Sequence, residues 1–130
     1  MIKNFKLKKV SENNCDLIYF NKIKKIINNP ERIFFLNAKK NCVRGNHAHK
    51  LCAQYFFCLN GNVEINIDNG KKDKFYNLKF GSILKIKPLN WVKVYLKKDQ
   101  ILCVVCDKGY SEKEYIRSYS KFKNITNKVK

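Results

Sequence analysis

The stretch RGNHAHKLCAQYFFCLNG, residues 44–61, holds both histidines of the chain, two positions apart, beside one of its three arginines. On a β-strand, side chains two residues apart project to the same face, so His47 and His49 are expected to point together. Burying unpartnered imidazoles is costly and depresses their pKa values, so a purely structural pair would need dedicated partners. The pair therefore predicts a functional site on one face of a strand.

The sequence on either side of this stretch predicts an all-β fold. Expected strands are RIFFLNA (32–38), HAHKLCAQYFFCLN (47–60, one long strand or two), VEINID (63–68), FYNLKF, SILKIKP, WVKVYL and ILCVVCD. Asn69-Gly70 is a strong hairpin signal, so FYNLKF should return antiparallel to VEINID. Short strands at this regular spacing are typical of a sandwich or a small barrel.

The C-terminal segment is expected to close the fold with a short helix. In YSEKEYIRSYSKFK, Ser111 is a candidate N-cap and Glu114 follows three residues later, a capping-box pattern. Tyr115 and Arg117 are expected to dock this helix against the barrel. Residues 124–130 are expected to fray.

Length and hydropathy indicate one domain, residues 1–130. The basic first residues lack the apolar core of a signal peptide, and no apolar run approaches membrane-spanning length. We therefore expect a cytoplasmic protein that does not contact a membrane.

The six cysteines include a C-x-x-C at 103–106, which raises a zinc or redox alternative. These two residues lie within the continuous apolar run ILCVVC, which favours a buried strand where cysteine behaves as a small hydrophobe. Reduced, buried thiols are the favoured interpretation.

A net charge of +18 indicates an anionic partner, and nucleic acid is one class to consider. The charge comes from 25 lysines spread along the whole chain, whereas readers of nucleic-acid grooves rely on clustered arginine forks. No nucleic-acid partner is expected. The basic field would still attract a small anion such as a nucleotide diphosphate.

The spacing around the histidines resembles the first cupin motif. His-x-His is followed by four residues, Gln54, six residues and Gly61, with glutamine where the motif usually has glutamate and Asn41 where it has glycine. The resemblance implies a double-stranded β-helix, or jelly-roll barrel, whose mouth holds a small ligand.

The second cupin motif follows in outline over residues 81–93, but its histidine position falls on Val92 or Lys93. Two histidines and an amide are a weak donor set for zinc or iron. We therefore expect no metal and no cofactor, and the imidazoles are free for acid-base chemistry.

A closer resemblance spans roughly residues 30–123 and is carried by ERIFF, VRGNHAHKLCAQ, LNGNVEINIDNGK, KPLNW and EYIRSY. These segments resemble the sugar 3,4-ketoisomerases that act on dTDP-4-keto-6-deoxyglucose. The resemblance implies an isomerase that moves the keto group from C4 to C3 through an enediol. It also implies a homodimer that exchanges N-terminal strands, and a role in making 3-amino-3,6-dideoxysugars for surface polysaccharide.

By the same resemblance, His47 and His49 are the base and the proton donor, with His49 favoured as the base. Arg44 would hold the diphosphate or stabilise the enediolate oxygen, although a structural role at the barrel rim stays open. The face on which the enediol is reprotonated decides the C4 configuration, which the sequence does not choose.

Three further residues are candidates for substrate binding. Arg32 is a second anion contact or a structural ion-pair partner, and Gln54 bonds the sugar or a histidine or is structural. Trp91 stacks on the thymine or forms a wall of the pocket, with a core position as the alternative. Family members often carry tyrosines in the strand written here as RIFFLN, so Phe35 is expected to replace a tyrosine near the sugar.

Three other functions remain open at this stage. The first is a related cupin epimerase acting at C3 and C5 of the same sugar nucleotide. The second is a non-catalytic cupin that binds a sugar nucleotide, and the third is a basic nucleic-acid module.

Overall fold

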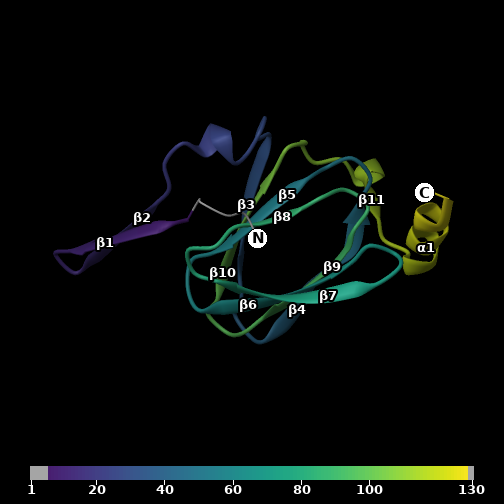
Figure 1. The fold of residues 1–130 in the computed structure, drawn as a ribbon. Coiled ribbons are helices and arrows are strands. Elements are labelled where there is room, and N and C mark those ends of the chain that lie inside the picture. Colours follow the sequence, from purple (N-terminus) through teal and green to yellow (C-terminus); the bar gives the residue numbers. More distant parts are fainter. Residues whose placement is uncertain (1–5, 129–130) are drawn as a thin grey trace.

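The computed structural model describes residues 6–128, most of which lie in β-strands (Figure 1). In chain order the strands are β1 (Lys8–Glu12), β2 (Cys15–Tyr19), β3 (Arg32–Asn37), β4 (Cys42–His49), β5 (Gln54–Cys58), β6 (Asn62–Asp68), β7 (Asp73–Lys79), β8 (Leu84–Ile86), β9 (Trp91–Leu96), β10 (Ile101–Cys106) and β11 (Tyr115–Ile116). Two 3₁₀ turns, η1 (Ile23–Lys25) and η2 (Glu112–Glu114), and one helix, α1 (Tyr119–Lys128), complete the described part of the chain. None of these helical segments is long and apolar enough to cross a membrane.

Two antiparallel sheets form the barrel, one in the order β3-β10-β5-β8 and the other in the order β11-β4-β9-β6-β7. Their inward-facing side chains alternate along each strand and make one core, with Val63 and Ile65 from β6 meeting Leu102 and Val104 from β10. The expected all-β barrel with a short C-terminal helix is confirmed. The predicted hairpin is also present, since β6 and β7 pair antiparallel from Asn62–Lys79 to Asp68–Asp73.

The two cysteines of the C-x-x-C pattern face opposite sides of their sheet. Cys103 packs with Leu7, Ile26 and Ile27 outside the barrel, while Cys106 belongs to the core between the sheets. Three residues is an odd spacing on a strand, so the two thiols diverge and do not form a shared zinc or redox site. Both are free and buried, as expected.

The N-terminal hairpin of β1 and β2 projects from the barrel, on the side away from α1 (Figure 1). Among residues 6–128, these two strands pair with each other and with no other strand. Val10 and Leu17 are 46% and 60% exposed on this hairpin. The hairpin therefore presents apolar side chains away from the barrel.

The C-terminal segment differs from the sequence prediction. Ser111 precedes only the short turn η2 and makes no capping bond with its side chain, because the next residues, Tyr115 and Ile116, pair with β4 as strand β11. The helix begins at Tyr119 and continues to Lys128, so residues 124–128 of the segment that was expected to fray are helical in the structure; residues 129–130 lie outside the described residues. Phe122 and Thr126 are buried one turn apart on this helix and hold it against the barrel.

Candidate active site

A cavity of about 500 Å³ lies between the two sheets and is called here the inner cavity. Its floor and walls are apolar: Phe34, Leu36, Phe56, Val92, Val94 and Val104. Its polar lining is Arg32, Arg44, His47, Gln54, Tyr110, Tyr115 and Arg117. All three arginines of the chain therefore meet at one cavity, whereas no lysine among residues 6–128 lines it.

A β-bulge in β4 positions two of these residues. The register with β9 shifts between Gly45 and His47, so Asn46 is the extra, unpaired residue. Gly45 and Asn46 both have positive φ, 85° and 62°. In a regular strand, residues three apart face opposite sides, and the extra residue brings Arg44 and His47 to the same cavity. A Cβ on Gly45 would lie 2.7 Å from the carbonyl oxygen of Val92, so glycine is required there.

Trp91 forms a hydrogen bond with the bulged residue Asn46 and does not line the inner cavity. Its Nε1 donates a hydrogen bond to Asn46 Oδ1 at 3.1 Å. The ring is 3% exposed and packs against Tyr119 and Phe122 of α1. Trp91 thus occupies a core position against the terminal helix, which was the alternative to a contact with the nucleotide.

His47 is the imidazole that faces the cavity. Its Nδ1 lies 3.1 Å from the carbonyl oxygen of Gly45, and because a carbonyl only accepts, Nδ1 carries the hydrogen in this contact. The lone pair of Nε2 is then free to accept a proton. Burial lowers the pKa of His47, and the charges of Arg117 and Arg44 lower it further against the Gly45 hydrogen bond.

His49, two residues farther along β4, is buried and does not line the inner cavity. It is 6% exposed, and both ring nitrogens are inaccessible and lack a hydrogen-bond partner in the part of the chain that the structure describes. Burial, and then the neighbouring His47, lower the pKa of His49 to about 4. An unsatisfied buried polar group costs about 1–3 kcal/mol. Such a residue is hard to explain by stability alone.

The two imidazoles are close, as the spacing predicted, with ring centroids 5.2 Å apart and planes at 85°. Only His47 of the two lines the inner cavity, however. The expectation that His49 is the base is not supported by this arrangement, because His47 and Tyr115 line the cavity and His49 does not.

Tyr115 lies in the site, although its sequence context predicted that it docks the terminal helix. It pairs across β11 and β4 with His49, and its ring is 4.5 Å from that imidazole and 4.9 Å from His47. Arg32 Nη1 donates to the Tyr115 hydroxyl oxygen at 3.0 Å. Arg32 thus lines the inner cavity, held by a phenol rather than by a carboxylate.

Arg117 also belongs to the site and was missed. Its guanidinium lies 4.4 Å from the centre of the Tyr115 ring and forms a two-bond ion pair with Glu112 at 2.5 and 3.0 Å. The scarcity of arginine was a signal that could have found it, since a chain that otherwise uses lysine retains arginine at only three positions.

Arg44 is exposed at the edge of the cavity. Among residues 6–128 it has no hydrogen-bond or ion-pair partner, unlike Arg32 and Arg117. Its forked donors are therefore available for an anion.

Gln54 is 4% exposed on β5, where it lines the cavity and donates to the Cys106 sulfur at 3.4 Å. Val92, one of the two candidates for the missing second-motif histidine, pairs directly with His47 and lines the same cavity. The donors near the cavity are therefore two imidazoles and an amide, with an apolar side chain where a third imidazole would face them. This set suits proton transfer better than tight binding of zinc or iron.

Phe35 lies away from the site. It is 57% exposed, whereas its neighbours Phe34 and Leu36 line the cavity. The prediction that Phe35 replaces a tyrosine beside the sugar is wrong by one residue of strand phase, and Phe34 occupies the inward position.

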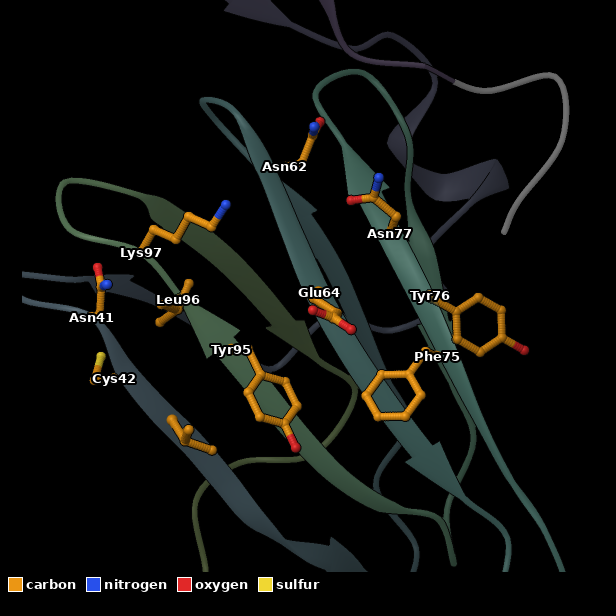
Figure 2. A pocket seen from close by; sticks show the side chains of 11 residues that line it. Asn41, Cys42, Asn62, Glu64, Phe75, Tyr76, Asn77, Tyr95, Leu96 and Lys97 are labelled. Carbon is orange, nitrogen blue, oxygen red and sulfur yellow. The ribbon is translucent and has the colours of Figure 1, made fainter.

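A second and larger hollow of about 690 Å³ lies on the other face of the β4–β9–β6–β7 sheet (Figure 2). We call it the outer hollow. Phe75 and Tyr95 lie side by side there, with ring centroids 6.2 Å apart, and Glu64 lies between β7 and β9 on the same face. Its lining includes Asn62, Asn77 and Lys97, but no histidine or arginine.

Comparison with known proteins gives a consistent picture. A family model described as "FdtA: WxcM-like, C-terminal" matches residues 1–127. The chain is 28% identical over 130 residues to the TDP-4-oxo-6-deoxy-α-D-glucose-3,4-oxoisomerase of Aneurinibacillus thermoaerophilus, covering 98% of this chain and 94% of that protein.

Two solved structures extend this comparison. The TDP-fucose-3,4-ketoisomerase WlaRA of Campylobacter jejuni is 31% identical with a TM-score of 0.78, covering 97% of this chain and 98% of that one. The 3,4-ketoisomerase QdtA of Thermoanaerobacterium thermosaccharolyticum, as a histidine-to-asparagine mutant in complex with TDP-4-keto-6-deoxyglucose, is 27% identical with a TM-score of 0.82. That match covers 99% of this chain and 98% of the mutant chain.

Proposed function

Because this chain belongs to the FdtA family of WxcM-like proteins, we propose that it is a sugar-nucleotide 3,4-ketoisomerase. It moves the keto group of TDP-4-keto-6-deoxyglucose from C4 to C3. The observation that carries the proposal is the inner cavity, where a free imidazole edge faces a space lined by three arginines. An imidazole supplies proton transfer, and guanidinium groups supply recognition of a diphosphate.

The reaction needs a base at C3, because the C4 carbonyl acidifies the C3 hydrogen. His47 fits this role, since its Nε2 lone pair is free and its lowered pKa keeps the ring neutral near pH 7. Proton removal gives an enediolate with its charge on the C4 oxygen. A proton then passes from the C3 hydroxyl to the C4 oxygen, and return of a proton to carbon C4 gives the 3-keto sugar. A positioned base of this kind contributes about 10²- to 10⁴-fold to the rate.

We assign the second proton transfer to His49. Its ring nitrogens have no partner within the described residues, and its ring centroid is 5.2 Å from that of His47, which holds the proton taken from C3. His49 receives that proton by way of His47, and because burial disfavours its charged form, the protonated ring readily gives the proton to C4. A small shift of the His47 ring around the bound sugar would expose His49. This reverses the order favoured from the sequence, where His49 was the base.

Arg44 is the diphosphate contact in this proposal, because it is exposed at the cavity edge and unpaired among residues 6–128. Gln54, on the cavity wall, donates to or accepts from a sugar hydroxyl. Arg32 acts through the phenol that it holds.

The protein is further proposed to be a homodimer that exchanges its N-terminal hairpin. Support comes from the exposed apolar side chains of this hairpin, Val10 and Leu17, and of strand β3, Ile33 and Phe35. Exposed apolar surface of this kind marks an interface. Light scattering at micromolar concentration tests the dimer, and a monomer mass would contradict it.

A cytoplasmic location and a role in surface-polysaccharide synthesis complete the proposal. Six free cysteines support a reducing compartment. A 3-keto sugar nucleotide is the substrate that an aminotransferase needs to make a 3-amino-3,6-dideoxysugar. Such a sugar would then enter a glycan of the O-antigen or S-layer type.

The test is incubation with TDP-4-keto-6-deoxyglucose, followed by NMR of the product. We expect the C4 carbonyl signal to be replaced by one at C3. Unchanged substrate in a sample that binds TDP would indicate a sugar-nucleotide sensor, and inversion at C5 would indicate an epimerase.

A further inference from the structure

Tyr115 contacts four of the polar groups in and behind the inner cavity. Its ring packs against His47 and His49 at 4.9 and 4.5 Å, and Arg117 lies over it at 4.4 Å. Its hydroxyl oxygen accepts from Arg32 at 3.0 Å. The residue lines the cavity itself, so a sugar bound in the inner cavity would lie against this side chain.

The hydrogen bond with Arg32 fixes the direction of the phenol. A guanidinium only donates, so the Tyr115 oxygen is the acceptor in this contact. Within residues 6–128, the hydroxyl makes no second hydrogen bond. Its own hydrogen is therefore unused, on a side chain that lines the cavity.

The surrounding structure holds Tyr115 rigidly. It forms β11 with Ile116 and pairs with His49 of β4. The preceding residue, Glu114, accepts from the backbone N–H groups of Leu51 and Cys52 at 2.5 and 2.6 Å. A donor held by such supports needs little reorganisation during a reaction.

We propose that Tyr115 is a further catalytic residue, whose hydroxyl donates a hydrogen bond to the sugar oxygen that becomes negatively charged. This inference rests on the proposed ketoisomerase function. When the base removes the C3 hydrogen, the electron pair forms the C3–C4 double bond and negative charge develops on the C4 oxygen. A donor already aimed at that oxygen stabilises the enediolate more than the ground-state ketone.

The chemistry of the side chain also distinguishes a hydrogen-bonding role for Tyr115 from a role in packing alone. A phenylalanine ring would make the same contacts with His47, His49 and Arg117, but would offer no hydrogen to the cavity and no acceptor to Arg32. The hydroxyl alone therefore carries the proposed effect.

The first test compares Tyr115→Phe with Tyr95→Phe, a matched loss of one phenol oxygen on the outer face of the same sheet (Figure 2). For Tyr115→Phe we expect kcat to fall by about 10²- to 10³-fold with KM almost unchanged, as for loss of one oxyanion donor. Tyr95→Phe should keep wild-type kcat. An unchanged kcat in Tyr115→Phe, or a rise in KM alone, would overturn the proposal.

The second test incorporates 3-fluorotyrosine at position 115, which retains the hydroxyl and the ring but makes the phenol more acidic. If the protonated phenol is the donor, the alkaline limb of the kcat profile should move to lower pH. A profile identical to wild type would overturn the proposal, even if Tyr115→Phe failed to fold.

Failure of this inference is distinct from failure of the proposed function. A wild-type protein that does not convert TDP-4-keto-6-deoxyglucose overturns both. A wild-type protein that converts it, with Tyr115→Phe equally active, overturns only the role of Tyr115.

Discussion

The inner cavity and the outer hollow lie on opposite faces of one sheet and draw on the same strands, β4 and β9, yet their chemistry differs. The outer hollow is larger, about 690 against 500 Å³, and carries asparagines, Glu64 and Lys97. The inner cavity carries all three arginines and His47 over an apolar floor, with His49 behind it. Convergent polar groups over apolar walls, with pKa values shifted by burial, mark the functional site better than volume does.

The largest expected effect is a difference in kcat between a variant of the inner cavity and a variant of the outer hollow. His47→Asn should lower kcat by about 10²-fold or more, because it removes the proposed base. Glu64→Gln, a change of similar size in the outer hollow, should leave kcat within experimental error. Steady-state kinetics measures both, and a large loss in Glu64→Gln with a normal His47→Asn would place the chemistry on the outer face.

The second effect concerns stability at acid pH. The pKa of His49 is lowered from 6.5 to about 4, so the unfolded chain takes up the proton more readily than the folded one. The stability linked to this group is fully present above pH 6.5 and is lost as the pH falls from 6.5 toward 4, by on the order of 3 kcal/mol.

His49→Asn should therefore show a smaller loss of unfolding free energy between pH 7 and pH 4 than wild type, by up to about 3 kcal/mol. The carboxylates are common to both proteins, so their difference isolates His49. Urea denaturation at each pH measures it. Parallel curves for the two proteins would show that His49 is not held neutral by the fold.

The third effect concerns the anion. Arg44→Gln should weaken TDP binding by about 10- to 100-fold, the range expected for losing a hydrogen bond to a charged group. Lys97→Gln removes the same charge from the outer hollow and should change the dissociation constant little. Calorimetric titration with TDP checks both variants. Equal weakening by the two would indicate a diffuse field rather than a specific contact.

The smallest expected effect is that of metal removal. The donors near the inner cavity are two imidazoles and an amide, with Val92 opposite His47. Dialysis against a chelator should leave turnover unchanged. Activity that is lost on chelation and restored by a divalent cation would show that the site needs a metal.

Much of the fold follows from the sequence because each strand carries its own signal. VEINID alternates apolar and polar residues, and the Asn-Gly turn returns the next strand antiparallel, as the β6–β7 pairing has it. The histidine pair also follows, since residues two apart share a strand face. The start of the helix could not be predicted in this way. Ser111 and Glu114 match a capping box, but the residues that follow, Tyr115 and Ile116, pair with β4 as a strand.

The rest of the site depends on which residues of each strand face the cavity, and the sequence does not determine this by itself. Nothing in RIFFLN says that Phe34 rather than Phe35 faces inward. The bulge at Asn46 likewise carries a contact between segments distant in the sequence, the hydrogen bond from Trp91. Tyr115 reaches the histidines only because β11 pairs with β4, a contact between segments more than sixty residues apart.

The most direct test of the central claim is isotope exchange in deuterated water. Wild-type protein and TDP-4-keto-6-deoxyglucose are incubated in D₂O, and NMR locates the deuterium. If the inner cavity carries out 3,4-ketoisomerisation, the hydrogen at C3 exchanges, deuterium appears at C4 of the 3-keto product, and C5 stays unlabelled. Deuterium at C5 at a rate matching C3, or no exchange in a sample that binds the nucleotide, would contradict the account.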